Sequence, residues 1–124
     1  MKRVYVAGAY SDDNILGVLK NMQKGMRTGT EVALCGFAPF VPWLDYQFQL
    51  MLRPEENENL TMDFYYNYSL AFLEVCDYVL VVPGFENSKG TLGEITKAKQ
   101  LNIPVYYSID DLVLADSNLE KTNV

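Results

Sequence analysis

The sequence predicts an α/β fold: a Rossmann-like (flavodoxin-like) three-layer sandwich, with a parallel sheet of four to five strands between two layers of helices. Two observations predict this class. Short apolar runs alternate along the chain with longer amphipathic stretches, a pattern typical of βαβ units. The runs Arg3–Ala7 and Asp77–Val82 are also almost continuously apolar, as expected for strands that helices cover on both faces.

The length and composition of the chain indicate one globular domain. It has 124 residues, of which 49% are hydrophobic and 21% are charged, so we expect a single domain over residues 1–124. The net charge of −6 argues against binding to a nucleic-acid polymer, although backbone N–H groups could still hold a small anion. No apolar run approaches the roughly 18 residues of a membrane span, so we expect no membrane partner.

The side-chain inventory restricts the chemistry further. Histidine is absent, which excludes histidine-based catalytic triads and imidazole metal sites. Cys35 and Cys76 are far apart and lie in apolar surroundings, so we expect both to be small core residues of a cytoplasmic protein. The carboxylates are scattered without the spacing of metal ligands, and we expect neither a metal nor an organic cofactor.

The first strand and the first helix are well marked. The strand Arg3–Ala7 ends at Gly8, and a loop rich in helix-capping residues leads into an amphipathic helix over Asn14–Leu34. Gly25 and Gly29 lie four residues apart on one face of that helix. Each weakens the helix by roughly 1 kcal/mol relative to alanine, and we expect a close backbone approach in return.

The middle of the chain is less regular. Gly36 is a natural C-cap, and the segment Phe37–Trp43 predicts a strand at the sheet edge because its two prolines cannot donate to a ladder. From Leu44 to Leu60 we expect a partly helical segment followed by a loop. An unusually aromatic helix is expected over Met62–Cys76, and Asp77–Val82 predicts the third strand.

The last third of the chain repeats the alternation. The residues from Pro83 to Gly90 predict a loop, Thr91–Leu101 predicts a helix, and Asn102–Tyr107 predicts the fourth strand. From Asp110 onward we expect one short helix that then frays.

The order of these elements predicts where a ligand would bind. Right-handed crossovers and a proline-rich edge strand give the strand order second, first, third, fourth. The order then reverses between the first and third strands, and in such sheets ligands bind outside the carboxyl ends of the strands at that reversal. The loops at that position are Gly8–Asn14 and Pro83–Glu94.

Glu94 is the strongest candidate for a catalytic group. Gly84 and Gly90 would let the backbone approach a ligand, and the N–H groups of the first helical turn would face it. We expect Glu94 in that first turn, where the helix dipole favours the anion that a nucleophile requires. The alternative is structural: Thr91 to Glu94 also has the spacing of a capping box, in which the glutamate ties back to its own helix.

The other candidates have structural alternatives of the same kind. Tyr5 could position Glu94 across the cleft, or it could be an ordinary strand residue. Asp77 could bind a ligand or cap the preceding helix, and Lys89 could bind a phosphate or be simply solvated. Aromatic side chains could stack on a nucleobase, or they could form the core or a subunit interface. These are Trp43, Tyr46, Phe48, Phe64, Tyr65 and Tyr68.

Four segments resemble one known family in order and spacing. They are Val4–Ser11, Gly36–Pro42, Leu73–Asp77 and Pro83–Glu94, the last with a Ser-x-Gly-x-x-x-Glu element at Ser88, Gly90 and Glu94. In these segments, which span most of the chain, the sequence resembles the nucleoside 2-deoxyribosyltransferase family. That family includes the 2'-deoxynucleoside 5'-monophosphate N-glycosidases and many small phage and bacterial relatives.

The resemblance implies a retaining cleavage of the N-glycosidic bond in a nucleoside or nucleotide. Glu94 would attack the anomeric carbon to form a glycosyl ester, and Tyr5 would hold its carboxylate. Water would then complete hydrolysis, or a second base would complete transfer. Ser88 and Gly90 match the loop that contacts the sugar or its 5' substituent. We also assign substrate contact to Gly8, Tyr10, Asp77 and Asn87.

One position departs from the family pattern. Family members carry an aspartate eight residues before the position of Asp77, where it serves base protonation or substrate binding, and here that residue is Ser69. A serine cannot act as a carboxylic acid. Asp45 or Asp63 could replace it, or the base could leave differently.

Two other functions therefore stay open. Ser69 favours a nucleotide-binding module that turns over poorly or not at all. The Pro83-Gly84 and Gly90-Thr91 pairs also resemble the PGGxGTxxE loop of nucleotide phosphoribohydrolases, although five residues separate the pairs here and two separate them in that motif. In either case we expect a homodimer or a higher homo-oligomer, because the second helix is so aromatic and the family resemblance implies one.

Overall fold

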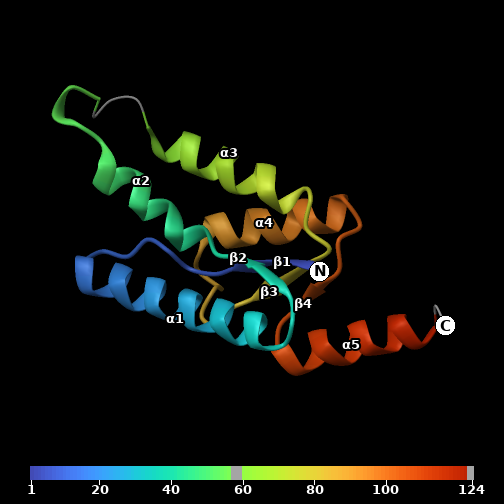
Figure 1. The fold of residues 1–124 in the computed structure, drawn as a ribbon. Helices are drawn as coiled ribbons and strands as arrows, with labels where there is room; N and C mark the ends of the chain where they lie inside the picture. The colour runs from blue at the N-terminus through green and yellow to red at the C-terminus, as the bar shows by residue number, and fades with distance from the viewer. Residues whose placement is uncertain (57–59, 123–124) are drawn as a thin grey trace.

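The structure, a computed structural model, describes residues 1–56 and 60–122. Its centre is one sheet of four parallel strands in the order β2-β1-β3-β4 (Figure 1). This confirms the predicted α/β class and the predicted strand order. The strands are β1 (Arg3–Ala7), β2 (Ala38–Phe40), β3 (Tyr78–Val81) and β4 (Val105–Tyr106).

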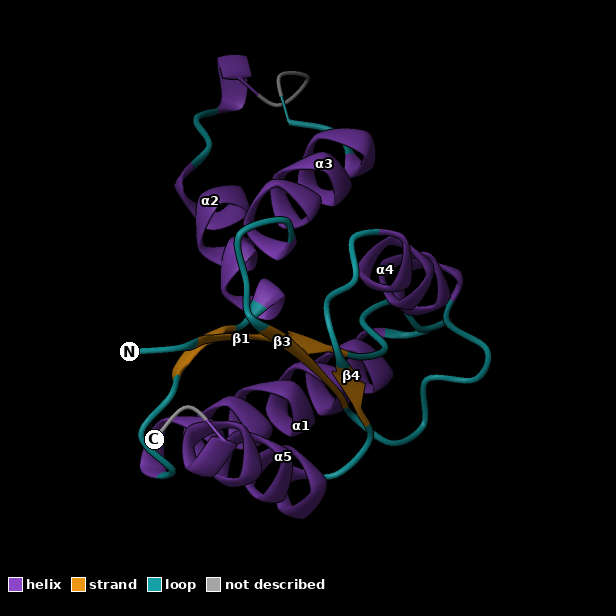
Figure 2. Ribbon diagram, turned by 90° about the vertical axis from the view of Figure 1, so that its right-hand side faces the viewer, coloured by secondary structure: helices purple, strands orange, loops and turns teal. Residues whose placement is uncertain are grey.

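Helices cover both faces of the sheet, which gives the predicted three layers. Figure 2 shows α1 and α5 on one face and α3 and α4 on the other, with α2 beside α3. None of the described helices is long and apolar enough to cross a membrane. The helices are α1 (Ile15–Leu34), α2 (Tyr46–Met51), α3 (Met62–Leu73), α4 (Lys89–Gln100) and α5 (Ile109–Thr122).

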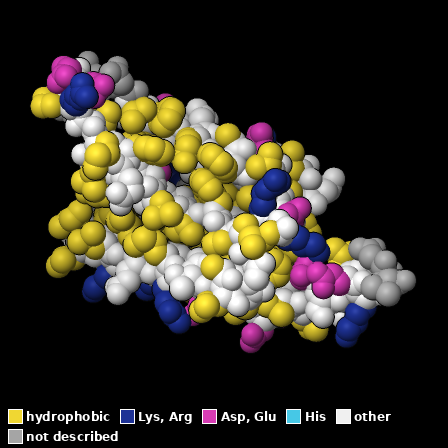
Figure 3. Space-filling view, viewed as in Figure 1, with side chains coloured by type: hydrophobic (Ala, Val, Ile, Leu, Met, Phe, Trp, Pro, Cys, Tyr) yellow, Lys and Arg dark blue, Asp and Glu magenta, His cyan; other side chains and the backbone are white. Residues whose placement is uncertain are grey.

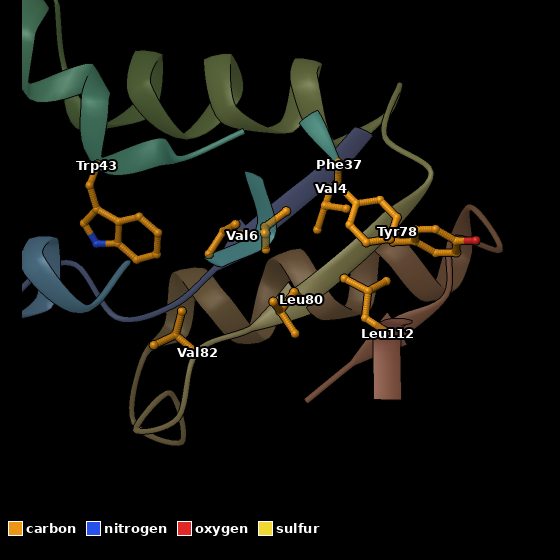
Figure 4. Packing of buried hydrophobic residues seen from close by; sticks show 9 residues of the cluster. Val4, Val6, Phe37, Trp43, Tyr78, Leu80, Val82 and Leu112 are labelled. Carbon is orange, nitrogen blue, oxygen red and sulfur yellow. The ribbon is translucent and has the colours of Figure 1, made fainter. Parts of the chain in front are cut away.

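Burial on both faces explains why β1 is apolar at successive positions. Val4 and Val6 pack on the face covered by α1 and α5, in a cluster that includes Leu112 (Figure 4). Tyr5 and Ala7 pack in a second cluster on the opposite face, together with residues of α3 and α4. Full burial of an aliphatic side chain stabilises the fold by about 1.5–3 kcal/mol. The same alternation directs Tyr5 toward the layer that contains α4.

Helix α1 forms as the sequence predicts. Asn14 is its N-cap, and the side-chain oxygen of Asn14 accepts a hydrogen bond from Gly17 N at 2.9 Å. The ring of Trp43 lies against Gly25 so closely that an added Cβ would overlap it. Trp43 also donates from Nε1 to the carbonyl oxygen of Ala9 at 3.1 Å. The predicted close approach at Gly25 therefore fixes the turn that follows β2.

The edge strand is shorter than predicted. We expected strand over Phe37–Trp43, whereas β2 ends at Phe40. Pro42 begins a 3-10 turn that extends to Asp45, because its fixed φ suits a first helical position and its missing N–H is not needed there. This turn directs Trp43 into the core.

Other boundaries and one burial prediction also differ. The segment Leu44–Leu60 is partly helical as expected, and residues 57–59 of its predicted loop lie outside the described residues. Helix α3 ends at Leu73, three residues before Cys76, which is buried. The prediction that both cysteines are core residues is wrong for Cys35, which is exposed because it forms the C-cap of α1.

The C-terminal helix is longer than expected because the sheet anchors it. Instead of a short helix that frays, α5 spans Ile109–Thr122, with Leu112 fully buried. Asp116 accepts a hydrogen bond from the Tyr78 hydroxyl at 2.8 Å and forms an ion pair with Lys2. These contacts tie the helix to β3 and to the N-terminus.

Candidate functional site

A cavity of about 660 Å³ opens at the carboxyl ends of the central strands. Its walls come from the loop after β1, the turn after β2, helix α3 and the N-terminal part of α4. The cavity therefore lies where the strand order reverses, which is the ligand position expected for an open parallel sheet. The sequence-predicted site residues that line it are Gly8, Tyr10, Asn87, Ser88, Gly90 and Glu94.

Glu94 lies in the second turn of α4 and forms part of the cavity wall. Its side chain is buried, and its Oε2 has no hydrogen-bond partner among the described residues. The capping-box alternative is wrong because the helix begins two residues before Thr91. Ser88 is the N-cap, and its Oγ accepts the hydrogen bond from Thr91 N at 3.3 Å. Glu94 therefore has no capping role.

The protonation state of Glu94 also differs from the prediction. Burial raises the pKa of Glu94 from 4.5 to about 8, and the nearby Tyr5 hydroxyl lowers it by less. The expectation that the helix dipole keeps this carboxylate ionised is wrong. Glu94 lies one turn beyond the helix start and loses its contact with water, and that loss outweighs a dipole effect of about 0.3–1 kcal/mol.

Tyr5 lies beneath the cavity wall, close to Glu94 and Ser69. Burial raises the pKa of Tyr5 far above its ordinary range, the Glu94 charge raises it further, and Ser69 lowers it. The hydroxyl does not reach hydrogen-bond geometry with either residue and has no partner in the described part of the chain. A buried polar atom left in this way costs about 1–3 kcal/mol, so two of them close together favour binding of a polar ligand group.

The N-terminus of α4 forms the neighbouring part of the wall. Ser88 Oγ lies 2.8 Å from Thr91 Oγ1, which together with the N-cap bond orders the first turn. Asn87 and Gly90 line the cavity beside it, and the N–H groups of a first helical turn are available to a ligand. Lys89 is the one Lys or Arg among the described lining residues.

A second buried carboxylate faces the cavity from the turn after β2. Asp45 is 8% exposed, and its Oδ1 accepts a hydrogen bond from the Tyr10 hydroxyl at 2.9 Å. Burial raises the pKa of Asp45, and the Tyr10 hydrogen bond lowers it in part. The Tyr10 ring is stacked with Trp43 at 6.5 Å. Gly8 leaves room for the Trp43 ring, because a Cβ there would lie 3.1 Å from Trp43 Cζ2.

Helix α3 supplies another part of the wall. Ser69 is 5% exposed and lines the cavity at the position where the resemblance leads us to expect an acid. Of the two aspartates considered as replacements, Asp45 lines the cavity, whereas Asp63 is exposed and does not. Tyr65 donates to Gln49 Oε1 at 2.8 Å, which links α3 to α2.

The aromatic residues divide into two groups. Trp43, Tyr46 and Tyr65 line the cavity, together with Tyr66, which the sequence did not single out. Phe48, Phe64 and Tyr68 lie outside it. The Tyr68 ring contacts both phenylalanine rings, with centroid distances of 5.7 Å to Phe48 and 6.1 Å to Phe64.

Asp77 is placed away from the cavity. It precedes β3, at the amino ends of the strands, and its Oδ2 accepts a hydrogen bond from Arg3 N at 2.7 Å. The prediction of substrate contact at Asp77 therefore needs correction: this carboxylate stabilises the start of β1.

Three lining residues have no signal in the sequence. Asn21 donates from Nδ2 to the Tyr10 carbonyl oxygen at 3.2 Å, and Gln49 and Tyr66 lie on α2 and α3. Their contribution depends on helix placement across the cavity, which periodicity does not determine. Within the described ranges, no group of three or more Asp, Glu, Cys or His side chains has a metal-binding arrangement.

Comparison with known proteins supports the fold. A family model described as "Domain of unknown function (DUF7768)" matches residues 2–108. The chain belongs to this family. None of the curated proteins matches this DUF7768 member.

A solved structure of a 2-deoxyribosyltransferase from Bacillus psychrosaccharolyticus is similar to this DUF7768 member. The TM-score is 0.56 and the sequence identity is 19%, over 83% of this chain and 69% of that enzyme. At this identity the likeness establishes a shared α/β fold. The neighbour itself is described as a biocatalyst for the synthesis of antiviral and antitumoral nucleosides.

Proposed function

We propose that this protein cleaves or transfers the N-glycosidic bond of 2'-deoxynucleosides or of their 5'-monophosphates. The observation that carries the proposal is Glu94: a buried carboxyl with an unpartnered Oε2, in the wall of a cavity at the carboxyl ends of the central strands. A solved structure with the same fold as this chain is a 2-deoxyribosyltransferase, which supports a nucleoside as the substrate class.

The proposed reaction has two steps at the sugar. The Glu94 carboxylate attacks C1' as the carbon–nitrogen bond breaks, and the bonding electron pair leaves with the base. Water then attacks C1' of the glycosyl ester to release the sugar, or a second base attacks to give a new nucleoside. Tyr5 is the positioning residue for the carboxylate, because its hydroxyl lies close to Glu94.

The remaining lining residues have binding roles in this proposal. Ser88, Asn87 and Gly90 contact the sugar or its 5' substituent at the start of α4, where Lys89 supplies a positive charge for a phosphate. Gly8 and the aromatic side chains of the lining are the proposed contacts of the base.

The first experiment measures release of free base from deoxynucleosides, their 5'-monophosphates and the corresponding ribonucleotides. We expect release from deoxy substrates and a decrease of at least about 10³-fold in Glu94→Gln. Glu86→Gln is the matched control, because Glu86 is an exposed carboxylate of the loop that precedes α4. No release from any deoxy substrate, or equal rates in Glu94→Gln and wild type, would contradict the proposal. Faster release from ribonucleotides would favour the phosphoribohydrolase alternative.

A second candidate function is a nucleotide-binding module without turnover. Two observations favour it: Ser69 occupies the wall where an acid is expected, and the pKa of about 8 leaves Glu94 protonated at neutral pH. Calorimetry with the same ligands separates the two functions. Tight binding without base release, unchanged in Glu94→Gln, would support the module.

The oligomeric state belongs to the same proposal. Exposed apolar side chains gather over α1, α2 and α3 (Figure 3). We propose that a second copy of the chain covers them, giving a homodimer. The residues are Ile15, Leu16 and Leu19 of α1, Leu50 and Met51 of α2, and Met62 and Phe64 of α3.

A further inference from the structure

Asp45 is a second buried carboxyl in the same cavity, and the proposed reaction leaves it without a role. Its Oδ1 accepts the hydrogen bond from Tyr10, which leaves Oδ2 as the oxygen that can contact a substrate. Tyr10 is itself fixed in place, because its ring stacks on Trp43 and its carbonyl oxygen accepts a hydrogen bond from Asn21 Nδ2. The carboxyl is thus oriented by a contact network that extends to α1.

The surroundings of Asp45 favour its neutral, proton-donating form. Among the described residues Asp45 has no ion pair, and its neighbours Tyr10 and Tyr65 are uncharged hydroxyl groups. Burial raises the pKa of Asp45. A carboxyl without a compensating positive charge and with little access to water has a raised pKa, which shifts it toward the protonated state that a general acid needs.

Asp45 and Glu94 approach the cavity from opposite sides of β1. Asp45 follows β2, Glu94 lies on the helix that follows β3, and β1 separates these strands. Neighbouring strands lie about 4.8 Å apart, so β2 and β3 are separated by about 10 Å. A nucleoside lying across the end of β1 with C1' toward Glu94 would extend its base toward Asp45.

We propose that Asp45 protonates the leaving base, with Tyr10 as its positioning residue. This assignment rests on the proposed glycosidic cleavage. Other carboxyls fit less well: Asp63 is outside the cavity, and Asp12, although it lines the cavity, is exposed and accepts a hydrogen bond from Asn14 N at 3.4 Å.

With this assignment every proton in the reaction has a donor and an acceptor. As the carbon–nitrogen bond breaks, the Asp45 proton moves to a ring nitrogen of the base, and the Glu94 carboxylate bonds to C1'. The base leaves neutral and Asp45 is left as a carboxylate. In the second step Asp45 takes the proton from the attacking water, or from the attacking base, and the Glu94 ester is released as a carboxylate.

The test uses two substrates that differ by one methyl group. 2'-Deoxyguanosine needs a proton on its departing base, whereas the base of 7-methyl-2'-deoxyguanosine already carries a positive charge and leaves as a neutral molecule. Both are used as nucleosides or as 5'-monophosphates, whichever form the wild-type protein turns over. We expect Asp45→Asn to slow the first substrate by about 10²–10⁴-fold and to change the second by less than about 10-fold.

Matched variants separate this role from a structural one. Tyr10→Phe removes only the hydroxyl and should give a smaller loss with the same preference for the methylated substrate. It also serves as the test if Asp45→Asn does not fold. Asp63→Asn, an exposed aspartate outside the cavity, should match wild type on both substrates. Equal losses on both substrates in Asp45→Asn, or no loss on either, would overturn the assignment.

The pH dependence gives a second readout. In wild type the reactive form carries one proton on the carboxyl pair, so kcat/KM should fall as pH rises above about 8. Asp45→Asn depends on ionised Glu94 alone, so its kcat/KM should rise through that pH. The groups that face the pair are tyrosines, with Asp12 and Lys89 elsewhere on the wall. The tyrosines are Tyr5 and Tyr66 near Glu94, and Tyr10, Tyr46 and Tyr65 near Asp45.

The outcomes for the two proposals are distinguishable. If wild type releases base from neither substrate, the proposed function fails and this assignment fails with it. If wild type acts on both and Glu94→Gln on neither, the proposed function stands. Only the substrate preference and the pH profile of Asp45→Asn then decide the role of Asp45.

Discussion

Glu94 has a raised pKa and a buried carboxyl oxygen without a hydrogen-bond partner among the described residues. The rise of its pKa from 4.5 to about 8 corresponds to a shift of about 5 kcal/mol toward the neutral form, which is much more than the 0.3–1 kcal/mol that a helix dipole returns. Its Oε2 nevertheless has no partner in the part of the chain that the structure describes. A group held in this state costs stability, and such costs cluster at sites where chemistry requires them.

The stability of the fold should therefore depend on the Glu94 proton. The folded pKa lies above the unfolded value of 4.5, so the contribution of Glu94 is fully present below about pH 4.5 and is lost as pH rises through about 8. Glu94→Gln cannot ionise. Its free energy of unfolding should exceed that of wild type by a few kcal/mol at about pH 9 and by less at about pH 6.

Urea denaturation at the two pH values checks this difference. Glu86→Gln, an exposed glutamate of the preceding loop, should behave as wild type at both. If the Glu94→Gln and wild-type stabilities change in parallel with pH, Glu94 is not the titrating group.

The elements illustrate which predictions a sequence supports. Helix α1 was predictable because its apolar period and its Asn14 cap are both local. The end of β2 was not, because the turn at Pro42 depends on Trp43 packing against a helix residue far away in sequence. Helix α5 was predicted too short for the same reason: Leu112 and Asp116 are held by partners on the sheet.

The close approach of α1 to the turn after β2 can be tested at Gly25. A methyl group there overlaps the Trp43 ring. Overpacking typically costs about 1–3 kcal/mol, which outweighs the roughly 1 kcal/mol that alanine adds to a helix. Gly25→Ala should therefore lower the free energy of unfolding. Lys24→Ala, at the exposed neighbouring position, should leave it nearly unchanged. Stabilisation by Gly25→Ala would mean that Trp43 is not packed there.

At the scale of the whole molecule, the strand order alone located the cavity, because the reversal is a property of topology. Residue roles were harder to predict. Asp77 was assigned to substrate contact, yet its Oδ2 accepts a hydrogen bond from Arg3 N at the other end of the strands. Asp45 was one of two candidates until burial and the Tyr10 contact distinguished it. The first outcome depends on which end of the sheet a residue reaches and the second on whether a side chain faces the cavity, and spacing does not contain that information.

The apolar surface over α1, α2 and α3 predicts a dimer. Light scattering at micromolar concentration should give twice the mass of the chain. Phe64→Glu introduces a charge within that surface and should shift the protein toward monomer. Leu114→Glu makes the same change at an exposed position of α5 and should leave the oligomeric state unchanged. A monomer mass for wild type would contradict a second copy as the occupant.

The most direct test of the central claim is to trap the sugar on the enzyme. A 2'-fluoro-arabinosyl nucleoside slows breakdown of the glycosyl ester, because fluorine destabilises the positive charge that develops at C1'. Mass spectrometry of the intact protein should show one added fluorinated sugar, and peptide mapping should locate it on Glu94. An adduct on Asp45 or another side chain, or no adduct from a substrate whose base is released, would contradict the account.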